Sequence, residues 1–188
     1  MSEFELATPR LLLRDWRLGD RPAFATMNAD PAVMEFLSAT LRPDQSDALA
    51  LRFEDELERR GFCPWAVEDR ESGDFIGFIG LHEVPEYLPF APAVEVGWRL
   101  ARRYWGRGFA TEGARAAITF AFGDLCLGEI VSMTARLNVR SQRVMERLSM
   151  RRDPGEDFEH PHVDEGSDLR RHVLYRLTAV DWLGLPRD

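Results

Sequence analysis

Apolar residues recur along the chain in two patterns, and these predict which segments are helices and which are strands. In segment 44–60, Ala48, Leu51, Phe53 and Leu57 form an apolar stripe, which is typical of an amphipathic helix that ends at Gly61. Shorter runs rich in β-branched and aromatic residues predict strands at 10–14, 65–68, 75–84, 94–100, 130–135 and 172–177. Further helices are expected at 18–27, 32–37, 110–122 and 138–148, the last capped by Asn138.

The order of these elements predicts an α+β fold. Short turns join the strands at 65–68, 75–84 and 94–100, which favours an antiparallel meander. The sequence shows no linker, internal repeat or low-complexity segment. A chain of 188 residues is the usual size of one domain, so we expect residues 1–188 to form a single domain.

Composition and charge exclude several classes of protein. The formal net charge is −8, which argues against general affinity for nucleic acid. Neither a bilayer-spanning apolar run nor a signal-peptide pattern is present. Cys63 and Cys126 lack metal-ligand spacing and are expected to be buried or semi-buried thiols in a reducing environment. We therefore expect a cytoplasmic protein without membrane or nucleic-acid partners.

A histidine-rich loop superficially resembles a metal site. His160-Pro161-His162 is followed by Asp164 and Glu165, but the spacing matches no zinc motif. We therefore expect a surface loop near a substrate entrance and no bound metal.

The most informative stretch is 98–113, where a strand passes through a glycine loop into an alanine-rich helix. Gly106 and Gly108 allow a tight turn, and the following helix N-terminus offers unpaired N–H groups. Such a loop is a cradle for phosphate, although glycines of this spacing also occur in plain strand-to-helix turns. Four arginines crowd the region, as a highly charged phosphate ligand requires: Arg99, Arg102, Arg103 and Arg107.

The loop resembles the signature of the GNAT superfamily of acetyl-CoA-dependent N-acetyltransferases. Arg103-x-x-Gly106-x-Gly108 fits the Arg/Gln-x-x-Gly-x-Gly/Ala pattern and is neither a P-loop nor a Rossmann fingerprint. Within that superfamily, the chain is similar to the ribosomal-protein N-terminal acetyltransferase type. That similarity rests on T-P-R-L-L-L-R-D-W at 8–16, D-P-A-V-M-E-F at 30–36, V-G-W-R-L at 96–100 with Y-W-G-R-G-F-A-T-E at 104–112, and N-V-R-S at 138–141.

The resemblance implies a mixed, mostly antiparallel sheet of about seven strands with helices on both faces. It also implies a splay between the fourth and fifth strands, here 94–100 and 130–135, that admits the pantetheine of acetyl-CoA. The residues expected to bind this co-substrate are Trp98, Leu100, Arg103, Gly106, Arg107, Gly108, Ala110, Thr111 and Asn138. For Arg103 and Arg107, the alternative is a solvated surface role.

The catalytic residues are less specified by the sequence. Backbone N–H groups near Trp98 are candidates for holding a developing oxyanion. Ser141 matches a serine in the family's Asn-x-x-Ser pattern and is the candidate acid for the leaving thiol; its alternative is a backbone hydrogen bond in the first helical turn. Glu83 and Glu95, ahead of His82, are candidate bases, with structural or solvated roles as the alternatives and an arginine as a plausible partner for Glu95.

Two functions of different class fit these features. The first is an N-acetyltransferase that moves an acetyl group directly to a primary amine, either a protein N-terminus or a small molecule, without a covalent enzyme intermediate. The second is a non-catalytic acyl-CoA sensor that uses the same cleft. A more remote alternative is a nucleotide-binding module that shares only the loop. A homodimer is compatible with the fold.

Overall fold

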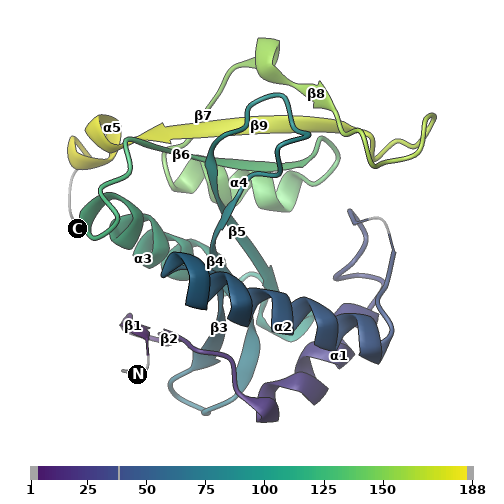
Figure 1. The fold of residues 1–188 in the computed structure, drawn as a ribbon, viewed down its shortest axis with the longest axis vertical. Helices are drawn as coiled ribbons and strands as arrows, with labels where there is room; N and C mark the ends of the chain where they lie inside the picture. Colours follow the sequence, from purple (N-terminus) through teal and green to yellow (C-terminus); the bar gives the residue numbers. More distant parts are fainter. Residues whose placement is uncertain (1–3, 38, 186–188) are drawn as a thin grey trace.

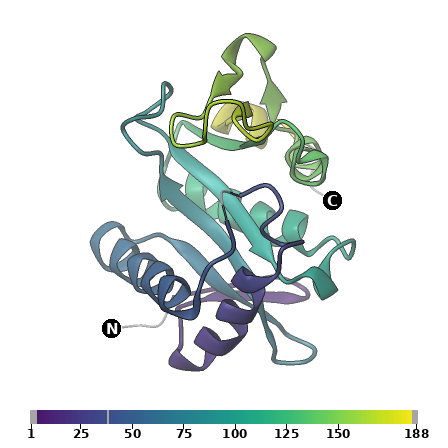
Figure 2. The same cartoon turned by 90° about the vertical axis from the view of Figure 1, so that its right-hand side faces the viewer.

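The computed structural model describes residues 4–37 and 39–185, which build one nine-stranded sheet with helices on both faces (Figures 1 and 2). The strand order is β1-β2-β3-β4-β5-β6-β9-β7, and β8 also pairs with β9. The strands are β1 (Glu5–Ala7), β2 (Leu11–Arg14), β3 (Pro64–Asp69), β4 (Phe75–Glu83), β5 (Val94–Leu100), β6 (Glu129–Ala135), β7 (Arg151–Arg152), β8 (Phe158–Glu159) and β9 (Arg171–Thr178).

The predicted mixed, mostly antiparallel sheet is confirmed. The pair β5–β6 is parallel, and the other described pairs are antiparallel. The sheet has nine strands where about seven were expected. Six of the nine lie at the strand ranges expected from the sequence; the other three, β1, β7 and β8, have only three, two and two residues and are too short to show an alternating pattern.

The long helices lie close to their predicted positions. The α-helices are α1 (Arg21–Ala29), α2 (Pro43–Arg60), α3 (Phe109–Gly123), α4 (Val139–Arg147) and α5 (Ala179–Leu183), and short 3₁₀ turns occur at η1 (Leu18–Asp20), η2 (Arg102–Tyr104) and η3 (Pro154–Glu156). Gly61 ends α2 in the left-handed conformation, at φ 76°. Asn138 caps α4 by accepting a hydrogen bond from the Ser141 N–H. None of the described helices is both long and apolar enough to cross a membrane.

The helix predicted at 32–37 is wrong, because this segment is a series of turns. The Ala32 N–H donates to the Asp30 side chain at 2.9 Å, and the Val33 and Leu37 N–H groups donate to the carbonyls of Asp30 and Met34, which closes two four-residue β-turns. The segment has six residues, too few to offset the cost of starting an α-helix. It therefore follows the local Asp30 turn instead.

Two expectations about burial need correction. The buried side of α2 includes Ala50 and Phe53, whereas Ala48 and Leu51 are exposed, so the apolar stripe is rotated from its predicted position. Cys126 is also exposed, although Cys63 is buried as expected. Cys126 lies in the turn after α3 with φ 53°, outside the packed elements.

Neighbouring residues of β4 show how the helices divide between the faces of the sheet. The Phe78 ring packs against Phe24 of α1 and Phe53 of α2. The Ile79 side chain points the other way, toward Gly113 of α3. Successive residues of a strand face opposite sides, so α1 and α2 cover one face and α3 covers the other. β5 runs between the lower strands and the β6–β9 pair (Figure 1).

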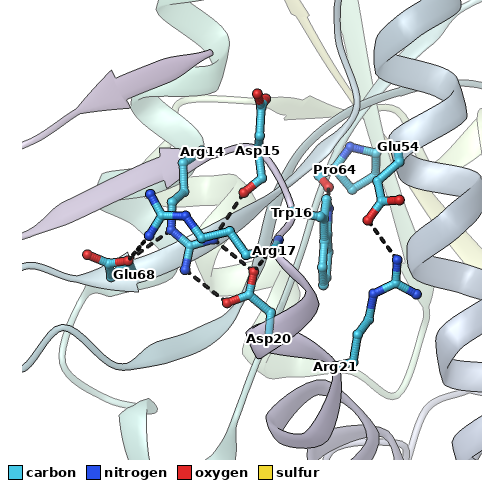
Figure 3. A network of polar contacts seen from close by, with 9 residues as sticks. All are labelled: Arg14, Asp15, Trp16, Arg17, Asp20, Arg21, Glu54, Pro64 and Glu68. Carbon is cyan, nitrogen blue, oxygen red and sulfur yellow. Dashed lines mark hydrogen bonds and ion pairs between the residues drawn. The ribbon is translucent and has the colours of Figure 1, made fainter. Parts of the chain in front are cut away.

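A buried ion-pair network holds the start of α1 against β2 and β3 (Figure 3). The Arg14 guanidinium donates to both oxygens of Asp20, at 2.8 and 2.9 Å, and its Nε donates to Glu68 at 2.8 Å. The Arg14 and Asp20 side chains are 4% and 6% exposed, whereas Arg17, which also reaches Glu68, is 51% exposed.

This network yields a stability prediction. Asp20→Asn should lower the free energy of unfolding by about 3–5 kcal/mol, because it leaves the buried Arg14 charge without its main partner. Arg17→Met, which removes an exposed pair from the same network, should cost about 1 kcal/mol or less. Urea denaturation of both variants measures the difference. Equal losses would mean that burial of the Arg14–Asp20 pair has no special weight.

Candidate functional site: a cleft beside the glycine loop

The glycine loop ends in an uncapped helix N-terminus. Gly106 and Gly108 have φ values of 73° and 82°, so both adopt the left-handed conformation that glycine tolerates best. Gly108 is the N-cap of α3 and provides no side-chain hydrogen bond to the first turn. The first N–H groups of the helix, including those of Ala110 and Thr111, therefore receive no capping side chain from Gly108, and such free N–H groups can bind an anion.

A brace from the N-terminal segment holds this helix end, and sequence reasoning assigned no role to its residues. Glu112 accepts hydrogen bonds from Thr8 Oγ1 at 2.6 Å, from the Arg10 N–H at 2.9 Å and from Arg10 Nε at 2.6 Å. Arg10 also donates to the Arg107 carbonyl at 2.9 Å. Burial opposes ionisation of Glu112, but the Thr8 and Arg10 hydrogen bonds outweigh it and lower its pKa. In the sequence, the T-P-R motif at 8–10 and the T-E motif at 111–112 were the features that could have indicated this contact.

Arg103 and Arg107 lie on the outer side of the loop. Arg103 is 68% exposed and 3.7 Å from Asp74, and Arg107 is 45% exposed and 3.9 Å from Asp69. Both ion pairs are long, so neither cation is firmly engaged by its carboxylate. Arg107 also lines a cavity of about 430 Å³ together with Arg10 and Arg70.

The strand that leads into the loop has a free edge. β5 pairs with β6 at Glu95 and Val131, and no further pair joins the two strands toward Leu100. The Ala101 N–H donates to Ile76 of β4, so alternation turns the backbone groups of Trp98 and Leu100 away from β4, toward the side of β6. The Leu100 carbonyl accepts the Trp105 indole N–H at 2.8 Å. The Trp98 backbone thus lies on an open strand edge, as a pantetheine-binding strand requires.

Ser141 and Asn138 are brought together at the start of α4. Asn138 Nδ2 donates to Ser141 Oγ at 3.1 Å and to Thr134 Oγ1 at 2.9 Å. Because Ser141 Oγ accepts this bond, its own hydroxyl proton is left to donate elsewhere. The Ser141 N–H donates to Asn138 Oδ1 at 3.2 Å, so the backbone of Ser141 takes part in the cap of α4.

The candidate bases differ sharply in their surroundings. Glu95 is 8% exposed in its side chain, and its Oε2 lies 3.1 Å from His82 Nε2. Its partner is thus a histidine and not an arginine. Glu83 is 51% exposed and paired with Arg60 of α2. Of the two carboxylates, Glu95 has the environment of a functional group.

His82 is tied electrostatically to Glu95. Burial lowers the pKa of His82, but the charge of Glu95 and the contact with it outweigh burial and raise that pKa above its ordinary value. His82 Nδ1 is buried and has no hydrogen-bond partner among the described residues. His82 thus has Nε2 beside the Glu95 carboxylate and a buried Nδ1 that no described residue hydrogen-bonds.

The histidine-rich loop packs against the β4–β5 loop and β9 rather than standing free. The Tyr87 ring, in the β4–β5 loop, lies 4.1 Å from the His162 ring, and the His160 and His172 rings lie 4.9 Å apart. Burial lowers the pKa values of both His160 and His172. Figure 1 shows the β4–β5 loop reaching across to β9. Within the described residues, no cluster of histidine, cysteine or acidic side chains has the arrangement to hold a metal ion.

The fold, the loop and the open strand edge together define a GNAT acetyltransferase. The family model described as an acetyltransferase (GNAT) domain matches residues 10–151, and the chain belongs to this family. GNAT enzymes are acyltransferases that use acetyl-CoA as co-substrate.

Individual proteins show the same relationship. YkkB of Bacillus subtilis is 30% identical over 150 residues, which cover 79% of this chain and 86% of YkkB. YdaF of Bacillus subtilis, which carries a ribosomal N-acetyltransferase name, is 33% identical over 76 residues, 40% of each chain. A solved acetyltransferase structure from Agrobacterium tumefaciens has a TM-score of 0.76 at 26% identity and covers 94% of this chain and 95% of its own. The expected resemblance to ribosomal-protein acetyltransferases is confirmed.

Proposed function

We propose that this protein transfers the acetyl group of acetyl-CoA directly to a primary amine, with both substrates bound at once. One observation carries the proposal: a single strand, β5, has an open edge at Trp98 and continues into the uncapped N-terminus of α3. An open edge can hydrogen-bond an extended pantetheine, and an uncapped helix end can bind its pyrophosphate. The open edge of β5 and the N-terminus of α3 follow one another along the chain, so one extended ligand can reach both.

The residues available for the co-substrate fit this path. The backbone of Trp98 and Leu100 would hold the pantetheine. The N–H groups of Gly106, Gly108, Ala110 and Thr111 would bind the pyrophosphate, with Arg103 and Arg107 beside it. Asn138 would contact the pantetheine. When bound, acetyl-CoA supplies the acetyl group as an activated thioester.

The side chains of the chain itself would handle two protons. An incoming ammonium must lose a proton, and the Glu95–His82 pair can accept it because the charge of Glu95 raises the basicity of the His82 imidazole. The departing thiolate must gain a proton, and Ser141 can donate its hydroxyl hydrogen because its oxygen already accepts the hydrogen bond from Asn138 Nδ2. Glu83 remains a second candidate base.

We further propose that residues 1–188 act as one domain in the cytoplasm, since one continuous sheet links β1 to β9. The acceptor is either a protein N-terminus or a small amine. YdaF's name points to ribosomal protein, but it covers only 40% of this chain and does not decide between the two. A homodimer is compatible with this proposal.

The direct test is release of free thiol from acetyl-CoA with N-terminal peptides and small amines added one at a time, alongside binding of acetyl-CoA by calorimetry. Thiol release that depends on one class of amine is expected. Tight acetyl-CoA binding without release by any amine would favour the sensor function. Binding of ATP or NAD at least as tight as that of acetyl-CoA would overturn the proposal in favour of a nucleotide-binding module.

A further inference from the structure

Arg99 stands apart from the other arginines by its combination of burial and lack of a carboxylate partner. The other partly or wholly buried arginines, Arg14, Arg21, Arg170 and Arg176, each form an ion pair at 2.7–3.5 Å. Arg99 is partly buried on β5 and forms no ion pair with any residue that the structure describes. A buried cation normally has a compensating anion, so this position calls for one.

The guanidinium of Arg99 is held in place without being neutralised. Its Nη1 donates to Asn28 Oδ1 at 2.8 Å, and its charged carbon lies 5.1 Å from the centre of the Phe78 ring. Asn28 is fully buried and is itself fixed by a hydrogen bond to Ser46 Oγ at 2.9 Å. Burial and the nearby Arg52 lower the pKa of Arg99 to about 10, so it remains charged at neutral pH. The one named hydrogen bond leaves most of its five donors available.

Arg99 shares a face of β5 with Gly97 and Glu95, the face covered by α1 and α2. Gly97 has no side chain, and a Cβ at this position would find only His82 Cε1 within 4 Å, at 3.7 Å. Open space therefore lies over Gly97. A carboxylate stands at one end of it and an arginine at the other, with their Cα atoms about 13 Å apart along the strand.

We infer that the acceptor of this enzyme carries an anionic group, foremost a carboxylate, and that Arg99 binds it while the amine lies toward Glu95. This inference rests on the proposed function and names its substrate class. A ligand with an amine at one end and an anion at the other matches the two charges of this face. Arg99 is thus a specificity-determining residue that touches the acceptor without taking part in proton transfer.

The test compares each acid with its own amide. The amines are glycine, β-alanine, 4-aminobutyrate, 5-aminovalerate and a peptide with N-terminal Ala-Asp, each paired with its carboxamide or with Ala-Asn in the peptide. In the wild type, kcat/KM should favour the acid by about 10- to 100-fold, as expected for a charge-assisted contact. Arg99→Met should abolish the preference mainly through KM. Arg99→Lys, which retains the charge, should restore part of it.

Several controls separate this inference from its rivals. Arg115→Met removes an exposed arginine from α3 on the opposite face and should leave the preference intact. Thermal unfolding verifies that each variant folds, and calorimetry on the CoA-loaded protein compares acid with amide even where turnover is slow. The inference is overturned if acids and amides have equal kcat/KM and equal affinity in the wild type, or if the preference for acids survives Arg99→Met. It is also overturned by a loss of acetyl-CoA affinity in Arg99→Met that is the same for every acceptor, which would assign Arg99 to the phosphates. Failure of the wild type to bind acetyl-CoA would instead overturn the proposed function.

Discussion

Replacing Glu95 by Gln should lower kcat/KM for acetyl transfer by about 10²- to 10⁴-fold, the usual contribution of a general base. The substitution keeps the size of the side chain and removes only its charge. The Glu95 carboxylate lies 3.1 Å from His82 and accepts the Met133 N–H at 3.3 Å, on the face of β5 opposite α3. The Kd for acetyl-CoA should not change, because Glu95 is outside the glycine loop.

The same pair predicts how the rate of acetyl transfer changes with pH. Glu95 raises the pKa of His82 above the ordinary value of 6.5. The pair can take a proton from the amine only after His82 has lost its own, so the rate should rise as pH increases through this raised pKa. The stability contributed by the charged pair changes in the opposite direction: it is complete below about pH 6.5 and is lost as pH rises through the folded-state pKa. In Glu95→Gln, the pKa of His82 should fall, because burial then acts without its counterion.

Steady-state rates between pH 5 and 9 measure both effects. Glu58→Gln, which alters an exposed carboxylate on α2, serves as the matched control and should leave the profile unchanged. A larger loss in Glu83→Gln than in Glu95→Gln would transfer the role of base to Glu83. An unchanged acidic limb in Glu95→Gln would show that the His82–Glu95 pair does not control the profile.

The second large effect is expected at Ser141. Ser141→Ala should lower kcat by about 10- to 100-fold, less than a full general-acid effect because a thiol of pKa about 8.5 is already a good leaving group. The Kd for acetyl-CoA should remain within about twofold, since the Asn138 cap of α4 uses the Ser141 N–H, which the variant retains. Single-turnover acetyl transfer measures the chemical step directly.

Two further variants sharpen the Ser141 test. Ser141→Cys keeps a proton donor at the same position and should recover part of the rate. Thr119→Val removes an exposed hydroxyl from α3 and should have no effect. If Ser141→Ala keeps the wild-type kcat, Ser141 has a structural role only, as a residue that completes the first turn of α4.

Much of the site could be predicted because its parts are local. Gly106, Gly108 and the helix that follows them form one continuous stretch, so short-range backbone preferences are sufficient to produce the left-handed glycine turn and the uncapped helix N-terminus. Asn138 and Ser141 likewise meet within one helical turn, and their spacing alone predicts the cap. Their catalytic and binding roles remain predictions.

The remaining features depend on pairs of residues far apart in the sequence. His82 meets Glu95 because they are opposite each other in the β4–β5 register, whereas the sequence alone suggested an arginine as the partner of Glu95. Glu112 meets Thr8 across 104 residues, and Arg99 meets Asn28 across 71. The segment 32–37 failed as a helix because a local Asp30 turn competed with a weak, short pattern.

The sequence by itself therefore determined the order of the long helices and strands, the glycine loop and the family. It did so because backbone conformation, capping and hydrophobic period act over a few neighbouring residues. Only the tertiary structure decided which carboxylate is buried beside a histidine and which arginine is buried without a carboxylate partner. Those outcomes depend on strand register and on how α1 and α2 cover the sheet, and the energies that set them arise from contacts between distant parts of the chain.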